Sequence, residues 1–464
     1  MKSKTPASHP AVSPARAAAF DILLRVERDS SYASELLHSR TYERLAAVDH
    51  SLATELVMGV LRWRSLLDSE IAKGSEQALS KLDLEILVAL RLAVYQFCWL
   101  SRIPARAAIN ESVELVKRAR KRSAAPFVNA VLRNLAAGIR SKLEAPQLAI
   151  NGASVETLAH SSAHPRWLVE RWVQAYGLES TLCICRHNQS VPVTAIRLRR
   201  REVAARLKAD GIELVPGALL TSARRVAQGD IGRTACFRDG LCVIQDEASQ
   251  LVADLVSQGV RILDCCAAPG GKTLAIVDRN ASAQITAVEI HPHRARLLKK
   301  LLGTQNPAVD SAVDHVRVVA ADARNLPFAT KFDSILADVP CSGTGTLARN
   351  PEIKWRLTPE DLADLQKRQI AILRAAMDRV TVGGRLIYST CSLEREENED
   401  VVERCLAEDS SFRTHDCRIE LERIRQEGEL IWPDPSSLMR GPYLRTLPGV
   451  HPCDGFFAAI LRKI

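Results

Sequence analysis

The spacing of hydrophobic residues divides the chain into three stretches. From residue 14 to residue 145, apolar positions recur every three or four residues, which is the period of a buried or amphipathic helix. The apolar faces are Ala17, Phe20, Leu23, Leu24 and Val26, then Leu52, Leu56, Val57, Val60 and Leu61, then Leu87, Leu90, Leu92, Val94, Tyr95 and Phe97. The pattern predicts an all-α bundle over residues 14–145, preceded by a disordered, mostly polar tail over residues 1–13.

Residues 146–240 mix two patterns. A helix is predicted from His164 to near Gly177 and a second over residues 182–188, whereas residues 193–198 alternate like a strand. We therefore expect a small α/β connector over residues 146–240.

Residues 241–464 alternate strand-like and helix-like segments. Strands are predicted at 260–263, 285–288, 316–319, 334–337 and 385–388, and helices at 273–279, 292–302, 359–379 and 396–406. This alternation is typical of a parallel sheet with helices on both faces. We therefore expect a Rossmann-like α/β domain whose ligands gather beyond the carboxyl ends of its strands.

Composition narrows the possible partners. The 464 residues suffice for two to four domains, and the formal net charge of +9 favours a polyanionic partner. The most apolar run, 84–100, is interrupted by Glu85, Arg91 and Gln96. No apolar segment follows the first lysines, so we expect neither a membrane span nor a signal peptide. The absence of any Cys-x-x-Cys pair argues against a metal site and predicts a reducing cytoplasm.

The turn after the first predicted strand of the last domain is rich in small residues. The strand ends on Asp264, and Gly270 and Gly271 precede a helix, so the backbone can approach a ligand closely. A Walker A loop is excluded because Cys266 stands where its first glycine is required, and G-x-G-x-x-G is absent. Two interpretations remain, a βα turn without a ligand and a site for a nucleoside without a phosphate chain, such as S-adenosylmethionine. The expected cofactor residues of this turn are Cys266, Ala267, Ala268, Pro269, Gly270, Gly271 and Lys272.

Acidic residues end the following strands. Glu289 is placed to accept both ribose hydroxyls, because one carboxylate takes two donors well. Asp322 is placed to accept the adenine amino group, although a single acid at a strand end is often only a helix cap. Asp338 ends the fourth strand and completes the expected cofactor residues.

Two cysteines are expected at the same rim of the sheet. Cys341 follows the fourth strand and Cys391 the fifth, both in loops rich in Pro, Ser, Thr and Gly. A buried, inert thiol is the common fate of cysteine, but apolar packing is not the obvious need in such loops. A thiolate that adds to carbon 6 of a pyrimidine makes carbon 5 nucleophilic towards a methyl group. Asp338 is then expected to hold the edge of a cytosine that has left its stack.

Two basic clusters are candidates for contact with RNA phosphates. The first basic cluster is Arg118, Arg120, Lys121 and Arg122, and the second basic cluster is Arg197, Arg199, Arg200 and Arg201. For the first, a solvated helix end explains the charges equally well, whereas the density of the second favours phosphate contact.

The helical region resembles the NusB-like RNA-binding domain. The matching stretches, in the same order, start at Ala17-Ala-Ala-Phe-Asp-Ile-Leu, Leu90-Arg-Leu-Ala-Val-Tyr-Gln, Ala107-Ala-Ile-Asn-Glu-Ser-Val-Glu-Leu-Val and Phe127-Val-Asn-Ala-Val-Leu-Arg-Asn. The resemblance implies a compact helical module that docks on structured RNA.

The last domain resembles the Nol/Nop/Sun family of RNA cytosine-5 methyltransferases. The matching motifs start at Gln245-Asp-Glu-Ala-Ser, Asp264, Asp338-Val-Pro-Cys-Ser-Gly, Arg349-Asn-Pro-Glu and Tyr388-Ser-Thr-Cys-Ser, followed by Glu396, Asn398 and Glu399 and then by Asp454-Gly-Phe-Phe. With a NusB-like domain in front, the chain is similar to the Sun/Fmu group, which methylates one cytosine of small-subunit (16S) ribosomal RNA. The resemblance implies S-adenosylmethionine as cofactor, a ribosomal RNA partner and no metal, and we expect a monomer. One departure is Glu289, where the family usually has aspartate, which affects only fine geometry.

The role of each cysteine follows from the resemblance. Methyltransferases acting on carbon 5 of DNA pyrimidines use a Pro-Cys cysteine, which would point to Cys341. The RNA family uses the Thr-Cys cysteine, which makes Cys391 the expected nucleophile and Cys341 the residue that assists product release. Two alternatives stay open: a tRNA cytosine-5 methyltransferase, although these enzymes generally lack a NusB-like domain, and a non-catalytic RNA-binding assembly factor.

Overall fold

The computed structural model describes residues 12–139, 154–200, 202–256, 258–303 and 315–464, so that most of the predicted tail lies outside it. The chain divides into two compact units. The first unit comprises Met1–Val191 and Leu347–Arg356, and the second comprises Pro192–Thr346 and Leu357–Ile464.

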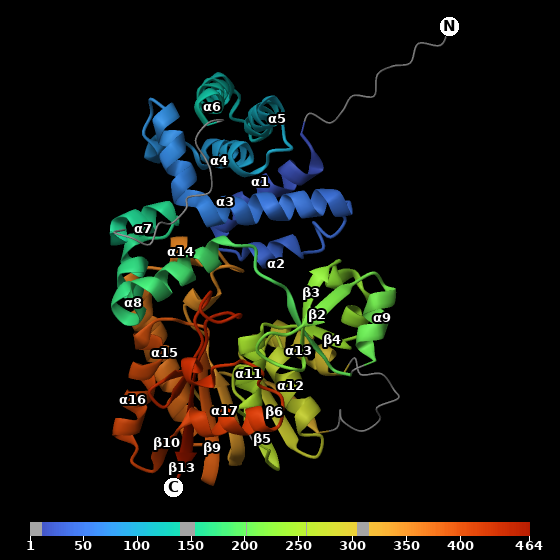
Figure 1. Ribbon diagram of the computed structural model, residues 1–464, viewed down its shortest axis with the longest axis vertical. Coiled ribbons are helices and arrows are strands. Elements are labelled where there is room, and N and C mark those ends of the chain that lie inside the picture. Colours follow the sequence, from blue (N-terminus) through green and yellow to red (C-terminus); the bar gives the residue numbers. More distant parts are fainter. Residues whose placement is uncertain (1–11, 140–153, 201, 257, 304–314) are drawn as a thin grey trace. The chain divides into compact units, whose positions relative to one another are not determined.

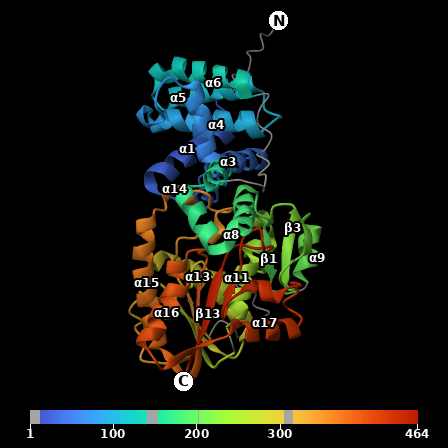
Figure 2. The ribbon, with the colours of Figure 1, turned by 60° about the vertical axis from the view of Figure 1, so that its left-hand side comes forward.

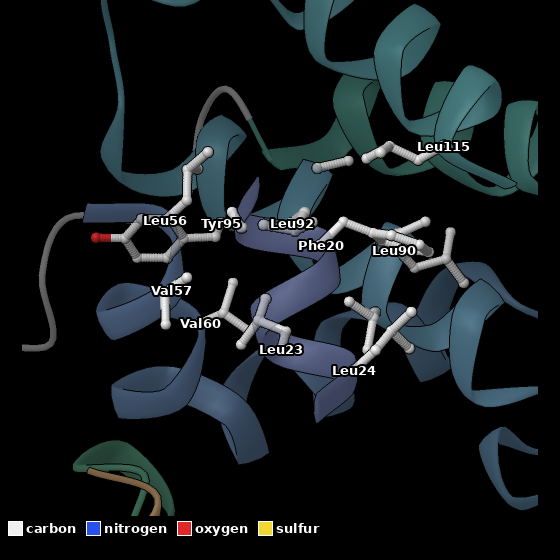
Figure 3. Close-up of a cluster of buried hydrophobic side chains, with 14 of the residues drawn as sticks. Phe20, Leu23, Leu24, Leu56, Val57, Val60, Leu90, Leu92, Tyr95 and Leu115 are labelled. Carbon is white, nitrogen blue, oxygen red and sulfur yellow. The ribbon is translucent and has the colours of Figure 1, made fainter. Parts of the chain in front are cut away.

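The first unit begins with a helical bundle, as the sequence predicted. Its helices are α1 (Pro14–Asp29), α2 (Ala33–Leu37), α3 (Ala47–Gly74), α4 (Leu84–Trp99), α5 (Ala105–Arg118) and α6 (Ala125–Ile139) (Figure 1). Figure 3 shows the core, in which Phe20 and Leu23 of α1 lie with Val60 of α3 and Leu92 of α4. Helices α3 and α4 approach closely at Gly59, because a Cβ there would stand 2.0 Å from the Tyr95 ring. The apolar residues that recur every three or four positions in the sequence therefore form the buried faces of these helices.

Two further segments belong to the first unit. Helices α7 (Val155–Ser161) and α8 (Arg166–Gln189) contain buried apolar residues, and α8 is interrupted at Gly177, whose φ is 80°. The sequence assigned these helices to the 146–240 connector, but their contacts group them with the bundle. The structure thus divides the predicted connector after Val191.

The segment Leu347–Arg356, which contains the short helix α14 (Ile353–Arg356), also belongs to the first unit. The Lys354 ammonium donates to the carbonyl of Arg62 (2.9 Å), and the Trp355 indole donates to the carbonyl of Leu61 (2.6 Å). The Arg356 guanidinium donates to three carbonyls at the end of α1, those of Val26, Ser30 and Ser31. The carbonyls at the end of α1 are natural acceptors for the Arg356 cation because they lack partners within the helix. Together with the bonds to α3, these contacts hold the segment against the bundle.

The second unit starts with a small antiparallel sheet. Its strands β1 (Ala195–Leu198), β2 (Glu213–Pro216), β3 (Ala223–Gln228) and β4 (Cys242–Ile244) lie in the order β2-β3-β1-β4. Helices α9 (Val203–Ala209) and α10 (Ala235–Arg238) accompany it. A small core that includes Ile196, Val203, Leu207 and Ile212 fills the space between them. This part is the α/β connector that the sequence predicted, reduced by its first two helices.

The remainder of the second unit is a nine-stranded mixed sheet. Strands β5 (Arg261–Asp264), β6 (Gln284–Glu289), β7 (Val316–Ala320), β8 (Phe332–Asp338) and β9 (Val380–Thr390) run parallel in the order β9-β8-β5-β6-β7, as predicted. Strands β10 (Phe412–His415), β11 (Met439–Arg440), β12 (Tyr443–Arg445) and β13 (Phe457–Lys463) extend it, and β13 pairs antiparallel with β9. The five predicted strands are thus parallel, and the four last strands, which the sequence did not predict, make the sheet mixed.

Helices cover both faces of this sheet. Helices α15 (Pro359–Met377) and α16 (Glu399–Glu408) lie on one side of the strands, and α17 (Cys417–Gln426) lies on the other (Figure 2). Helices α11 (Glu247–Asp254), α12 (Gly271–Arg279) and α13 (Pro292–Gly303) complete the unit. Successive strand residues enter opposite cores: Ile262 packs with α12 and α17, whereas Leu263 packs with α15 and α16. This two-residue alternation is what a sheet buried on both faces requires.

Among the residues that the structure describes, no helix has the length and apolar character needed to cross a membrane. The same residues contain no group of three or more His, Cys, Asp or Glu side chains suited to hold a metal ion.

Candidate functional site

The carboxyl ends of β5, β8 and β9 meet at one edge of the large sheet. The chain continues from β5 to β6 on one side and from β8 to β9 on the other, so the strand order reverses between β5 and β8. Such a reversal leaves a crevice where ligands of α/β sheets bind. Asp264 ends β5, Asp338 ends β8 and Thr390 ends β9, so the residues predicted at strand ends are brought together here.

Asp264 is buried with one oxygen unpaired. Its Oδ2 accepts from the Thr273 hydroxyl (2.7 Å), whereas its Oδ1 has no hydrogen-bond partner among the described residues. Burial raises the pKa of this carboxyl to about 7, with the Thr273 bond opposing the shift and the charge of Asp338 adding to it. A buried acceptor without a donor is uncommon in native structures and often marks a place for a ligand.

This shift predicts a pH dependence that can be measured. The unfolded carboxyl ionises near pH 3.8 and the folded one near 7, so Asp264 favours the fold at low pH and this contribution is lost as the pH rises through 7. We expect the unfolding free energy of the wild type, relative to Asp264→Asn, to fall by up to about 4 kcal/mol between pH 4 and 8. Urea unfolding of both proteins over this range checks it. A difference that stays constant with pH would contradict the shifted pKa.

The structure shows a reason for a glycine at position 270 in addition to the approach of a ligand that the sequence predicted. The φ of Gly270 is 118°, a conformation that favours glycine, and a Cβ would stand 2.7 Å from Leu298 and 2.8 Å from Leu301 of α13. The glycine is therefore required by the turn and by the packing of α13. Substitutions of Gly270 would report on folding rather than on a ligand alone.

Lys272 and Asp338 form a half-buried ion pair. The Lys272 ammonium lies 2.8 Å from Oδ2 of Asp338, while Oδ1 of Asp338 accepts from the Ser389 hydroxyl at 2.7 Å. Burial lowers the pKa of Lys272, but Asp338 and the charge of Cys391 more than offset this, so the net shift is upward and the lysine stays protonated. The sequence placed Lys272 among the cofactor residues, whereas its contacts join it to Asp338 and electrostatically to Cys391.

Glu289 and Asp322 differ in how many hydrogen bonds their carboxylate oxygens already accept. Glu289 is buried, and its Oε1 accepts from the backbone N–H of His291 (2.8 Å). Both oxygens of Asp322 accept from the guanidinium of Arg324, and this pairing lowers the Asp322 pKa. Of the two acids, Glu289 therefore has more capacity left for a ribose, and Asp322 would have to share its oxygens with Arg324.

The two predicted cysteines are adjacent. The Cys341 and Cys391 sulfur atoms lie 3.2 Å apart, which is hydrogen-bonding distance. The hydrogen bond to Cys391 is the largest cause that raises the pKa of Cys341, followed by burial and by the charges of Cys391 and Glu397. The two thiols are therefore coupled, and a negative charge on the Cys391 sulfur makes ionisation of Cys341 harder.

Four of the eight members of the two basic clusters are engaged in ion pairs. In the first basic cluster, Arg118 pairs with Asp21 and Lys121 with Asp83; in the second, Arg197 and Arg199 share Asp278. Arg120, Arg122 and Arg200 are exposed and have no ion pair with any described residue, and Arg201 lies outside the described residues. These pairs reduce the charge that each cluster has left for a polyanion.

The sequence did not single out Glu397, which the structure places behind both cysteines. It lies in a run of charged residues from Glu394 to Asp400 that looks like the exposed start of a helix. Its side chain is fully buried instead, with hydrogen bonds to Ser342 and Ser392. The available signal was its position six residues after the second predicted cysteine.

Comparison with known proteins assigns the chain to a family. Residues 254–462 match the model of 16S rRNA methyltransferase RsmB/F, residues 13–137 match the NusB family, and residues 164–230 match a ferredoxin-like domain of RsmF/B-like methyltransferases. The chain is 33% identical to a probable ribosomal RNA small subunit methyltransferase B of Bacillus subtilis over 455 residues, which cover 96% of this chain and 98% of that protein. The chain belongs to this methyltransferase family.

One further relative and two solved structures match large parts of the chain. The Pseudomonas syringae ribosomal RNA small subunit methyltransferase B is 32% identical over 90% of both chains. Among solved structures, PH0851 superimposes with a TM-score of 0.77 at 24% identity, covering 98% of this chain and 99% of that one. NSun6 from Pyrococcus horikoshii, solved with SFG, has a TM-score of 0.54 at 21% identity over 65% of this chain and 99% of that one. These two structures support the fold.

Proposed function

We propose that this protein uses S-adenosylmethionine to methylate carbon 5 of one cytosine in small-subunit (16S) ribosomal RNA, through a covalent bond between Cys391 and carbon 6. The observation that carries the proposal is the pair of cysteine sulfur atoms 3.2 Å apart at the ends of β8 and β9. They lie on loops next to the Lys272–Asp338 ion pair, in a chain of the small-subunit rRNA methyltransferase family. A single buried cysteine would not support the proposal in this way.

The cofactor residues proposed from the sequence fit S-adenosylmethionine. The unpaired Oδ1 of Asp264 and the half-engaged carboxylate of Glu289 offer acceptors for an ammonium group and a ribose. The small residues of the turn leave room for a nucleoside, and the related NSun6 structure was solved with SFG, an analogue of this cofactor. The proposed cofactor set remains Cys266, Ala267, Ala268, Pro269, Gly270, Gly271, Lys272, Glu289, Asp322 and Asp338.

In the proposed reaction, residues of this chain bind the base, attack it and release it. The target base leaves its stack, and Asp338, oriented by Lys272 and Ser389, holds the cytosine edge. The Cys391 sulfur forms a bond to carbon 6, and the electrons of the carbon 5–carbon 6 double bond make carbon 5 nucleophilic. S-adenosylmethionine, when bound, would supply an electrophilic methyl group and leave as S-adenosylhomocysteine, which keeps the electrons of the sulfur–methyl bond. Once carbon 5 is methylated, a base removes its proton, and the electrons left behind restore the double bond and expel Cys391 as a thiolate.

Two alternatives are separated by one experiment. Bisulfite sequencing of ribosomal and transfer RNA from a deletion strain should show one cytosine of 16S RNA that loses protection and regains it when the wild-type gene is restored. A lost signal in transfer RNA instead would favour a tRNA enzyme. Unchanged protection in both RNAs would favour a non-catalytic assembly factor.

RNA binding should depend on the unpaired members of the basic clusters. We expect Arg120, Arg122 and Arg200, changed together to Gln, to weaken RNA binding and to reduce the slope of log affinity against log salt by about one unit for each phosphate that is no longer neutralised. Arg118→Gln combined with Lys121→Gln is the matched control, because Asp21 and Asp83 already neutralise these side chains. Filter binding at several salt concentrations measures both. If the triple variant has the wild-type slope, the clusters are solvated surface.

A further inference from the structure

Glu397 is a buried carboxylate whose partners are all hydrogen-bond donors. Its side chain has no exposed surface, and no cation among the described residues pairs with it. Oε1 accepts from the Ser342 N–H (2.8 Å) and the Gln369 amide (2.9 Å), and Oε2 accepts from the hydroxyls of Ser342 and Ser392 (2.5 Å each). A buried charge is costly unless it is hydrogen-bonded on all sides, so this arrangement is a built site rather than an accident of packing.

The donors connect the two cysteine loops. Ser342 follows Cys341 directly, and Ser392 follows Cys391 directly, so one carboxylate holds the residue next to each sulfur. The two serine hydroxyls are also 3.0 Å apart. The Gln369 amide, which comes from α15, additionally donates to the carbonyl of Pro340, the residue before Cys341.

We propose that Glu397 is the positioning residue that sets the separation and orientation of Cys341 and Cys391, because its carboxylate joins their loops through Ser342 and Ser392. The inference rests on the proposed function for its meaning, but it concerns geometry that exists without RNA. Glu397 does not touch the reacting atoms. It acts through the two serines, and its role is to place both sulfur atoms beside the same pyrimidine ring.

The charge of Glu397 contributes a second effect. Together with the bond to Cys391 and burial, this charge raises the pKa of Cys341. The other titratable groups around the pair are Tyr388, itself buried with a raised pKa, and the Lys272–Asp338 ion pair. Removal of the Glu397 charge should therefore make Cys341 ionise at lower pH. Exposure of the thiol through lost packing would act in the same direction, so the comparison is made with a variant whose unfolding free energy equals that of the wild type.

The test is Glu397→Gln, which keeps the size of the side chain but replaces one acceptor oxygen by an NH₂ group. Alkylation of each cysteine by iodoacetamide, followed by peptide mass spectrometry across pH, measures the ionisation without RNA. We expect the Cys341 midpoint to move to lower pH. In single-turnover assays with saturating RNA and cofactor, we expect methyl transfer about ten- to a hundredfold slower, at unchanged affinity for both ligands.

The matched control is Glu420→Gln. Glu420 is a buried glutamate of the same unit, paired with Arg385 (2.7 Å) and Arg423 (2.9 Å), and it makes no contact with the cysteine loops. It should lower stability and leave both cysteine midpoints unchanged. If Glu397→Gln does not fold, Ser392→Ala is the test of the proposal. This variant removes the hydrogen bond between Ser392 and Glu397 but keeps the Glu397 charge. Methyl transfer should then slow, while the pH midpoint of Cys341 alkylation moves little.

The proposal is overturned if Glu397→Gln folds and has both the Cys341 titration and the single-turnover rate of the wild type. If Glu397→Gln does not fold, an unchanged rate in Ser392→Ala overturns it. If the wild type itself methylates no cytosine, the proposed function fails. The alkylation measurement does not depend on methyl transfer, so it would still test the positioning role of Glu397.

Discussion

Cys391→Ala should abolish methyl transfer while leaving the protein able to bind RNA and cofactor. Carbon 5 of cytosine is a poor nucleophile until a thiolate adds at carbon 6, so removing this sulfur removes the step that activates the base. We expect a loss of at least about a thousandfold in the single-turnover rate. Transfer of a tritiated methyl group to 16S RNA measures it, and a denaturing gel should show no covalent protein–RNA complex.

The control for this variant is Cys405→Ala, which removes a buried thiol of the same unit that packs in the core on the α15 and α16 side. It should retain activity at a temperature where both proteins are folded. Residual activity of Cys391→Ala within tenfold of the wild type would remove Cys391 from the nucleophile position.

The core of the fold could be predicted because local sequence and global structure agree there. Strands β5, β6, β7, β8 and β9 are short apolar runs, several of them ending on an acid, and the helices between them repeat their apolar residues at helical spacing. The antiparallel strands could not be predicted in the same way. β13 lies in the middle of the sheet beside β9, but its partner is set by tertiary pairing across a long stretch of sequence rather than by a local turn.

The sequence predicted those site residues whose positions follow from motifs at the strand ends. It did not predict which side chains pair with residues far away in the sequence. Cys341, Cys391 and Asp338 lie at strand ends, so topology alone brings them to one edge of the sheet. The partners of Lys272, Arg197 and Arg199 are acids far away in the sequence, and nothing local identifies them. Glu397 was missed for the same reason, since a charged residue in a polar run is normally exposed.

The segment Leu347–Arg356 is a further case in which tertiary contacts decide. In sequence it stands between Cys341 and α15, inside the predicted catalytic domain, yet Trp355 and Arg356 donate to carbonyls of α1 and α3. Lys354 is 1% exposed, and burial is the main cause that lowers its pKa well below the usual value. A lysine in a polar stretch gives no local sign of such burial.

Cys341→Ala should trap the reaction after methylation rather than prevent it. Cys391 would still attack carbon 6, but the proton at carbon 5 must leave before the sulfur can be expelled, and the proposed helper for that release is gone. Cys341 suits this role because its sulfur lies 3.2 Å from that of Cys391. Once Cys391 is bonded to carbon 6, the hydrogen bond and charge of Cys391 that raise the Cys341 pKa are gone, so Cys341 can lose its proton and accept the one from carbon 5. We expect a covalent protein–RNA complex to accumulate several-fold above the wild-type level.

The measurement is a denaturing gel after incubation with 16S RNA and S-adenosylmethionine. The complex should disappear in the double variant Cys341→Ala, Cys391→Ala, because the bond forms to Cys391. The reverse pattern, a trapped complex with Cys391→Ala and none with Cys341→Ala, would exchange the two roles and make the Pro-Cys cysteine the nucleophile. Because the two sulfur atoms are within hydrogen-bonding distance of each other, either could reach a base bound at this edge of the sheet, and only this asymmetry separates the assignments.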